Sequence, residues 1–101
     1  MKIIAITSCP VGMAHTYMAA AALKKAAKEL GHEIKVETQG AMGIRDKITL
    51  DDIAEANIFI MAADVAVLEA ERFNNIYTYE TTTSKLIKKG KEVVKEAIAS
   101  I

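Results

Sequence analysis

Cysteine is nearly absent from this chain of 101 residues: the single one, Cys9, excludes an internal disulfide, and nothing suggests an oxidising compartment. A surplus of charge is also absent, because 13 basic and 13 acidic residues balance, so no general attraction to nucleic acid or acidic lipid is expected. No apolar run approaches the length of a membrane span, and residues 1–6 are too short for the core of a signal peptide. We expect a cytoplasmic protein with one domain over residues 1–101.

Short apolar runs alternate along the chain with segments of helical pattern. Residues 3–6 and 58–62 are continuously apolar, which is typical of strands covered on both faces. A third strand is predicted over residues 32–38, as an edge strand of the sheet, and a fourth over residues 76–80. Helical segments are predicted over residues 14–30 with Gly31 as the stop, 50–56 with Thr49 as the cap, weakly over 65–72, and after residue 83 with a break or kink at Gly90. This alternation predicts an α/β fold, a three-layer α/β/α sandwich with a parallel sheet.

The most informative stretch lies between the first strand and the first helix. A helix N-terminus leaves backbone N–H groups unpaired, and with the helix dipole they favour an anion. Cys9 lies at the mouth of this site, where the same donors stabilise a thiolate. We therefore interpret Cys9 as a nucleophile that accepts a phosphoryl group. The phosphate-binding loop is predicted to comprise Pro10, Val11, Gly12, Met13, Ala14, His15 and Thr16.

Each of these side chains also has a purely structural interpretation. A free cysteine is most often a buried small hydrophobe, but the position of Cys9 in a loop at a helix start favours the functional interpretation. His15 either stabilises the first helical turn or donates to the thiolate or phosphoryl oxygens, and both remain open. Thr16 is expected to cap the helix. Gln39 and Asp64 follow strands at the same sheet edge and are candidate supporting residues, although Asp64 is more simply a turn residue. The histidines belong to no ligand motif, so no metal or cofactor is expected.

The spacing of the loop resembles the Cys-x5-Arg motif of tyrosine phosphatases, but the sixth residue after Cys9 is His15. An arginine grips phosphate through two parallel hydrogen bonds, which a histidine cannot copy. A hydrolase also needs a leaving-group acid and an aligned water, whereas a carrier must avoid hydrolysis. The missing arginine therefore favours a phosphoryl carrier. A thiol-dependent low-molecular-weight phosphatase and a non-covalent phosphate-binding module remain as alternatives.

Cys9-Pro10-Val11-Gly12-Met13-Ala14-His15-Thr16 resembles the fructose-family enzyme IIB of the bacterial phosphoenolpyruvate-dependent sugar phosphotransferase system. The resemblance continues in Met18-Ala19-Ala20, in Val36-Glu37-Thr38-Gln39-Gly40 and in Ala62-Ala63-Asp64. It implies a sheet of four parallel strands in the order 2-1-3-4.

The resemblance also implies that Cys9 is the phosphocysteine. It would take the phosphoryl group from a phosphohistidine of enzyme IIA and pass it to a fructose or fructose-like sugar held by the membrane component, enzyme IIC. We accordingly expect a monomeric domain that acts at the inner face of the cell membrane. Residues 39–47 are interpreted as a loop, in which Ile44-Arg45-Asp46 departs from the family pattern of a small residue followed by Gln-Asn. If that loop contacts the partner or the sugar, the departure indicates a fructose-like branch of the family with another substrate.

Overall fold

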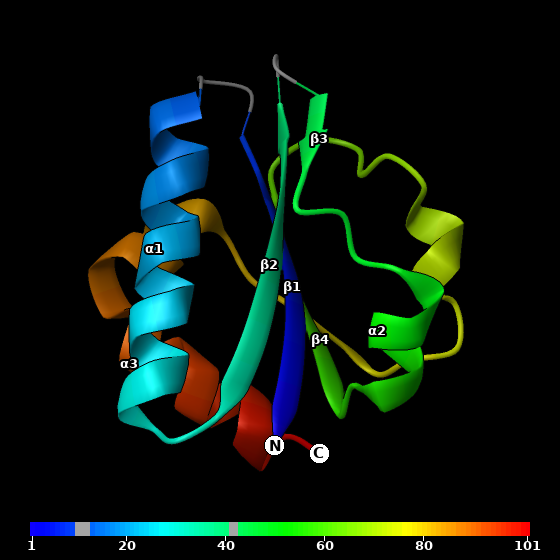
Figure 1. The fold of residues 1–101 in the computed structure, drawn as a ribbon. Coiled ribbons are helices and arrows are strands. Elements are labelled where there is room, and N and C mark those ends of the chain that lie inside the picture. Colours follow the sequence, from blue (N-terminus) through cyan, green and yellow to red (C-terminus); the bar gives the residue numbers. More distant parts are fainter. Residues whose placement is uncertain (10–12, 41–42) are drawn as a thin grey trace.

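A computed structural model describes residues 1–9, 13–40 and 43–101 of the chain. Within these residues the fold is α/β, with one mixed sheet of five strands and three α-helices (Figure 1). The elements in chain order are β1 (Lys2–Ser8), α1 (Met13–Glu29), β2 (Glu33–Gly40), β3 (Gly43–Arg45), α2 (Leu50–Glu55), β4 (Ile58–Ala63), the 3-10 helix η1 (Ala70–Phe73), β5 (Thr78–Glu80) and α3 (Thr83–Ala99).

The strands lie in the order β3-β2-β1-β4-β5. β1 pairs in parallel with β2 and β4, and β4 pairs in parallel with β5, whereas β3 pairs antiparallel with β2. The predicted all-parallel sheet of four strands in the order 2-1-3-4 is therefore wrong in strand count and order, because β3 extends the sheet beyond β2. The four expected strands are neighbours within it as β2-β1-β4-β5. For the same reason β2 is not the edge strand that the sequence predicts.

The helix boundaries largely follow the local signals in the sequence. Gly31, at φ +77°, follows the end of α1 in the left-handed conformation that glycine adopts most readily. Thr49 caps α2 in a capping box with Asp52. Lys89, at φ −140° and ψ 43°, interrupts the helical geometry of α3 one residue before the predicted site, Gly90. The weak helical pattern over residues 65–72 appears only as the short helix η1.

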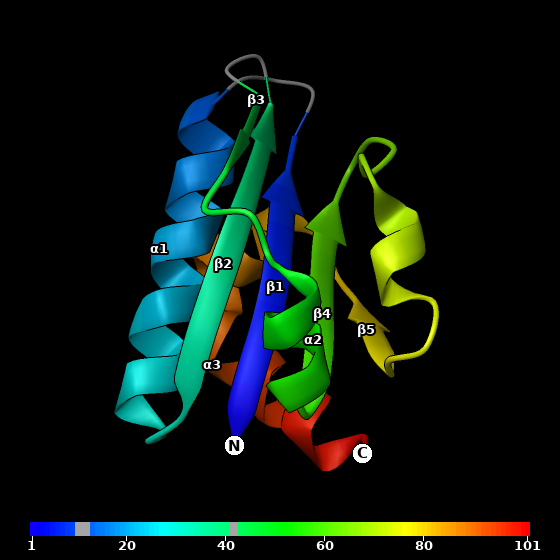
Figure 2. The same ribbon diagram turned by 45° about the vertical axis from the view of Figure 1, so that its right-hand side comes forward.

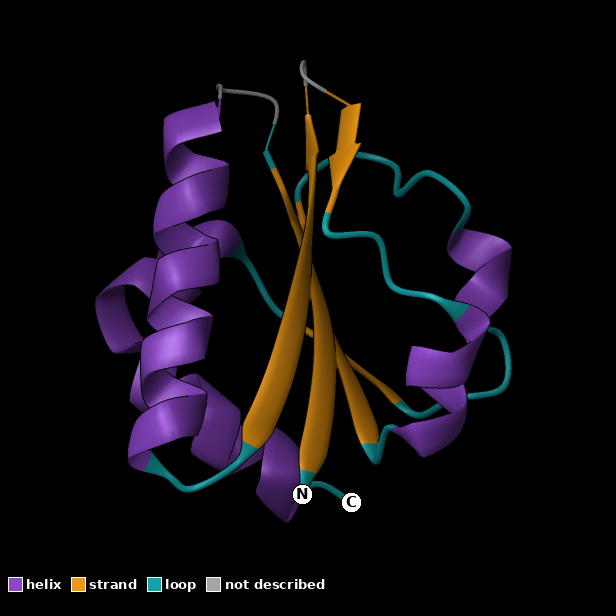
Figure 3. Ribbon diagram, viewed as in Figure 1, coloured by secondary structure: helices purple, strands orange, loops and turns teal. Residues whose placement is uncertain are grey.

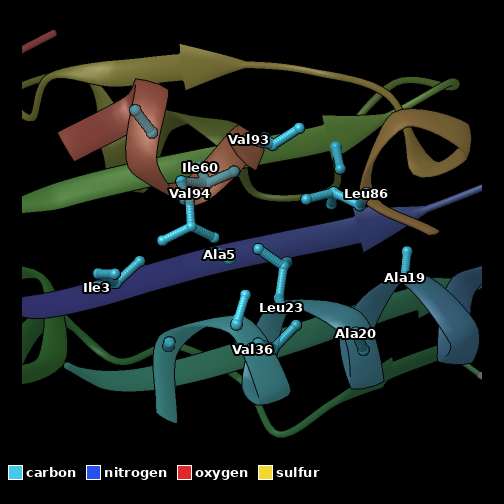
Figure 4. Packing of buried hydrophobic residues seen from close by; sticks show 14 of the residues in the cluster. Ile3, Ala5, Ala19, Ala20, Leu23, Val36, Ile60, Leu86, Val93 and Val94 are labelled. Atoms are coloured by element: carbon cyan, nitrogen blue, oxygen red, sulfur yellow. The ribbon is translucent and has the colours of Figure 1, made fainter. Parts of the chain in front are cut away.

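Helices cover both faces of the sheet, with α1 and α3 on one face and α2 and η1 on the other (Figures 2 and 3). Because successive strand residues point to opposite faces, each buried strand contributes to two apolar clusters. The larger cluster lies under α1 and α3, and small alanines of α1 allow it to pack close to the sheet (Figure 4). The smaller cluster lies under α2 and η1, where the rings of Phe59 and Phe73 stack with centroids 4.0 Å apart. Each large side chain buried in these clusters contributes about 1.5–3 kcal/mol to folding.

Parallel pairing brings the carboxyl ends of β1, β2, β4 and β5 to one edge of the sheet. Helices α1 and α3 begin at that edge, and both chain termini lie at the opposite one (Figure 1). In open parallel sheets ligands bind beyond the carboxyl ends of the strands, so this edge is where a site is expected. Within the described residues, no helix combines the length and the apolar character needed to cross a membrane.

Candidate functional site

Cys9 follows the last residue of β1 and is 8% exposed. Its Sγ lies 4.0 Å from Nδ1 of His15, which is an exposed residue in the first turn of α1. Cys9 is therefore a buried residue whose sulfur contacts a side chain at the start of a helix. Of the predicted phosphate-binding loop, Pro10, Val11 and Gly12 lie outside the described residues.

The first turn of α1 comprises Met13, Ala14, His15 and Thr16. Backbone N–H groups at the start of a helix have no preceding helical carbonyl to pair with, so they are available to an anion. Thr16 lies three residues past the start of α1, so its predicted capping role is wrong. Its side chain is completely buried, and its hydroxyl has no hydrogen-bond partner among the described residues.

Thr7 ties this helical turn to the sheet, a role that the sequence analysis missed. Its hydroxyl donates to the carbonyl oxygen of Thr16 at 3.1 Å, and the bond is buried. Thr7 precedes Cys9 by two residues, so strand alternation gives both side chains the same face of the sheet. This alternation is the sequence pattern from which the contact of Thr7 with the first turn of α1 could be inferred.

Gln39, a predicted supporting residue, has no described contact with Cys9. It is 2% exposed, and its amide brackets the backbone of Leu68: Oε1 accepts from the N–H at 2.8 Å and Nε2 donates to the carbonyl at 3.1 Å. Nε2 also donates to Glu37 Oε2 at 2.6 Å. Gln39 therefore holds the segment after β4 against β2, on the side of the sheet that η1 covers.

Glu37 and Arg72 form a buried ion pair that the sequence analysis did not single out. The Glu37 side chain has no exposed surface; it accepts from Arg72 Nη1 at 2.8 Å, from Arg72 Nη2 at 3.0 Å and from the Ile48 N–H at 2.8 Å. Burial opposes ionisation of Glu37, but the hydrogen bonds from Arg72, Gln39 and Ile48 outweigh it and lower the pKa of the carboxyl. A glutamate beside the buried Val36 in a strand is the only local signal of this pair.

Arg72 makes further contacts that fix the segment between β4 and β5. Its guanidinium donates to the carbonyl oxygens of Ile48, Leu68 and Glu69 at 2.7, 3.3 and 2.9 Å. It also lies 4.8 Å from the centroid of the Phe73 ring, within the range of a cation–π contact. The ion pair with Glu37 raises the pKa of Arg72 still further, so both partners are charged.

Asp64, the other predicted supporting residue, follows the end of β4 directly beside the end of β1. Its N–H donates to the carbonyl oxygen of Ser8 at 3.0 Å, and its carboxylate Oδ2 accepts from Thr83 Oγ1 at 3.0 Å. Thr83 is buried at the first position of α3, whereas Asp64 itself is exposed. Asp64 thus does more than turn the chain, because it joins β4 to the start of α3.

A family model described as "PTS system, Lactose/Cellobiose specific IIB subunit" matches residues 4–96 of this chain. The chain belongs to the IIB family of the sugar phosphotransferase system (PTS). This PTS IIB chain is 48% identical over 95 residues to the PTS fructose-like EIIB component 1 of Escherichia coli K12, covering 94% of this chain and 88% of that protein. It is 41% identical over 100 residues to the fructose-like EIIB component 2 of the same strain, covering 99% and 94%. The resemblance noted from the sequence is confirmed.

Solved structures give the same assignment. The solution structure of the enzyme IIB subunit of the PTS from Escherichia coli K12 has a TM-score of 0.90 and 48% identity, with 98% of this chain and 94% of that chain covered. A domain of the fructose-specific IIABC component from Borrelia burgdorferi has a TM-score of 0.90 and 40% identity, covering 97% and 93%. As a PTS IIB chain, this protein takes part in sugar phosphotransfer.

Proposed function

We propose that Cys9 carries the phosphoryl group in this transfer. It takes the group from a phosphohistidine of enzyme IIA and passes it to a fructose or fructose-like sugar bound by the membrane component IIC. The observation that carries the proposal is the position of the only cysteine of the chain, directly after β1 and 4.0 Å from His15 at the start of α1. We place this reaction in the cytoplasm, at the inner face of the cell membrane.

The two half-reactions balance without an outside reagent. In the first, the N–P bond of the phosphohistidine breaks as the S–P bond of phosphocysteine forms, and the thiol proton ends on the imidazole nitrogen. In the second, a sugar hydroxyl attacks phosphorus, an O–P bond forms and the S–P bond breaks. The proton that the hydroxyl loses balances the negative charge of the released thiolate. The protein contributes mainly positioning and electrostatic stabilisation of the three phosphoryl oxygens.

The first turn of α1 supplies the donors in this proposal. The N–H groups of Met13, Ala14 and His15 are fixed in direction before the phosphoryl group arrives, so they need no reorganisation during transfer. The bond from Thr7 to the carbonyl of Thr16 holds the turn against β1. The 8% exposure of Cys9 limits access of water to the sulfur, which suits a carrier better than a hydrolase.

The choice of sugar rests on the relatives alone. The two Escherichia coli relatives are named fructose-like, and the corresponding region of the Bacillus subtilis fructose-specific EIIABC component is 47% identical over 97 residues. That region makes up only 15% of the Bacillus subtilis protein. The matching family model is described by lactose and cellobiose instead. Fructose is the favoured substrate because the similar individual proteins share that name.

Phosphorylation with purified components tests the proposal. The chain is incubated with phosphoenolpyruvate, the general phosphotransferase proteins and a fructose-type IIA, and the intact mass and the modified peptide are measured. We expect one phosphoryl group on Cys9, and none on the Cys9→Ser variant, because a serine hydroxyl is far less ionised at neutral pH. His15→Gln is the control for histidine phosphorylation and should still be modified.

Two companion assays on the isolated chain distinguish the alternatives. Rapid turnover of an aryl phosphate by the isolated chain would favour a phosphatase. Phosphate binding that survives Cys9→Ala, with no covalent adduct trapped, would favour a non-covalent binding module. Either result, or a phosphoryl group on a histidine of this chain, would overturn the assignment of Cys9.

A further inference from the structure

We propose that the Asp64 carboxylate raises the tendency of phosphorylated Cys9 to give up its phosphoryl group, by placing a fixed negative charge beside the site. This inference rests on the proposed function, because it concerns the phosphocysteine. It assigns to Asp64 a role beyond that of joining β4 to α3. Asp64 acts through its charge, and its effect requires no contact with the transferred group.

The sheet register places the two residues next to each other. Ser8 of β1 pairs with Ala63 of β4, and the hydrogen bond from the Asp64 N–H to the Ser8 carbonyl, at 3.0 Å, continues the ladder one step further. Cys9 directly follows Ser8, and Asp64 directly follows Ala63. Neighbouring strands lie about 5 Å apart, so the two backbones are separated by roughly that distance.

Both side chains belong to the face of the sheet that α1 and α3 cover. On β1, Thr7 reaches the first turn of α1, and Cys9, two residues later, reaches His15 of the same turn. On β4, Ala62 belongs to the apolar cluster under α1 and α3, and Asp64, two residues later, binds Thr83 of α3. Strand alternation and these contacts agree that the sulfur and the carboxylate lie on the same side.

The charge of Asp64 is not cancelled by a neighbouring cation. Its described side-chain partner is the neutral hydroxyl of Thr83, and none of the salt bridges between described residues includes it. Within the described parts, the titratable side chain in contact with the sulfur is His15, whose Nδ1 lies 4.0 Å from Sγ. A thiophosphate carries close to two negative charges at neutral pH, as phosphate esters do. Repulsion from the carboxylate therefore destabilises phosphocysteine relative to the free thiol.

Such repulsion suits a carrier that must release what it has received. A thiophosphate that the helix N-terminus stabilised strongly would trap the phosphoryl group on this chain. Asp64 is exposed, so solvent screens its charge and the effect is moderate. For a separation of about 7 Å and an effective dielectric constant near that of water, we expect a change of roughly three- to tenfold in the partition of the phosphoryl group.

The test measures the equilibrium ratio of phosphorylated IIA to phosphorylated Cys9 after mixing known amounts of phospho-IIA and this chain. Asp64→Asn removes the charge but keeps an oxygen that accepts from Thr83, and it should shift the ratio roughly three- to tenfold toward phosphorylated Cys9. Thr83→Val removes the hydroxyl but keeps the charge, so it should leave the ratio unchanged. Glu33→Gln at the opposite end of β2, about 20 Å away, makes the same charge change and should also leave it unchanged.

The outcomes separate this inference from the proposed function. If the unmodified chain accepts no phosphoryl group on Cys9, both are overturned. If it does and Asp64→Asn leaves the ratio within twofold of the original, or if Glu33→Gln shifts it equally, only the role of Asp64 is overturned. Asp64→Ser, which also keeps a short acceptor for Thr83, replaces Asp64→Asn if thermal melting shows that the asparagine variant is unfolded.

Discussion

Removing the guanidinium of Arg72 should destabilise the protein strongly, because the Arg72 side chain is only 9% exposed and its partner Glu37 is fully buried. In Arg72→Met the Glu37 carboxylate stays in a site with no exposed surface, deprived of the two hydrogen bonds that Arg72 donates at 2.8 and 3.0 Å. Breaking a buried ion pair from one side typically costs about 3–5 kcal/mol. The free energy of unfolding of a small protein is only about 5–15 kcal/mol, so the variant should lose a large part of its stability.

The pH dependence of this loss identifies its cause. In the unmodified chain the pKa of Glu37 lies below its ordinary value, so the stabilisation is present above that ordinary value and is lost as the pH falls. In Arg72→Met burial still opposes ionisation while the main opposing hydrogen bonds are gone, so the pKa of Glu37 should lie above its ordinary value. The difference in unfolding free energy between the two proteins should therefore shrink as the pH is lowered from about 8 to about 4.

Urea denaturation of both proteins across this pH range provides the measurement. Lys47→Ala is the control: it breaks the exposed pair of Lys47 with Glu69, 2.8 Å apart, and should cost less than about 1 kcal/mol at every pH. Glu37→Leu combined with Arg72→Met should cost less than the sum of the two single changes by more than about 1 kcal/mol. A loss below about 1 kcal/mol in Arg72→Met, or a loss independent of pH, would refute the reasoning.

Two further changes test other contacts. A hydrogen bond from Lys35, together with the Thr49 N–H, lowers the pKa of Asp52 from 3.8 to about 2, so its stabilisation is present above pH 3.8 and is lost toward pH 2. Asp52→Asn should flatten the pH dependence of unfolding in that interval, and an unchanged slope would contradict this. A Cβ added at Gly90 would lie 3.3 Å from the Ala22 carbonyl oxygen. Gly90→Val should therefore destabilise by about 1–3 kcal/mol in thermal melting, whereas an unchanged midpoint would show that α3 can move away.

The central strands are predictable because their whole surface is buried. Residues 3–6 and 58–62 are continuously apolar, and both faces of β1 and β4 do pack against helices or side chains of the two clusters. β3 is not predictable in the same way, since Gly43–Arg45 is only three residues long and its middle residue is half-buried. Its place in the sheet depends on backbone pairing with β2, which leaves no periodic pattern in the side chains.

The candidate site likewise contains parts that local sequence patterns predict and parts that they do not. The place of Cys9 between β1 and the start of α1 is predictable, because the apolar strand and the helical pattern follow one another within a few residues. The pairing of Glu37 with Arg72 joins residues 35 apart in the chain, and no local pattern couples them. The cap assigned to Thr16 fails because Thr16 already lies inside the helix predicted over residues 14–30, and α1 begins three residues before it, at Met13.

Side-chain hydrogen bonds anchor the surroundings of Cys9 to the sheet from three sides. Thr7 binds the first turn of α1, Asp64 binds the start of α3, and Gln39 brackets the backbone of the segment after β4. Hydrogen bonds are directional, so they fix the approach of each element more narrowly than apolar packing does. If Cys9 exchanges a phosphoryl group with two successive partners, both partners require the same arrangement of groups around the sulfur. A frame held at several points on the sheet provides that constancy.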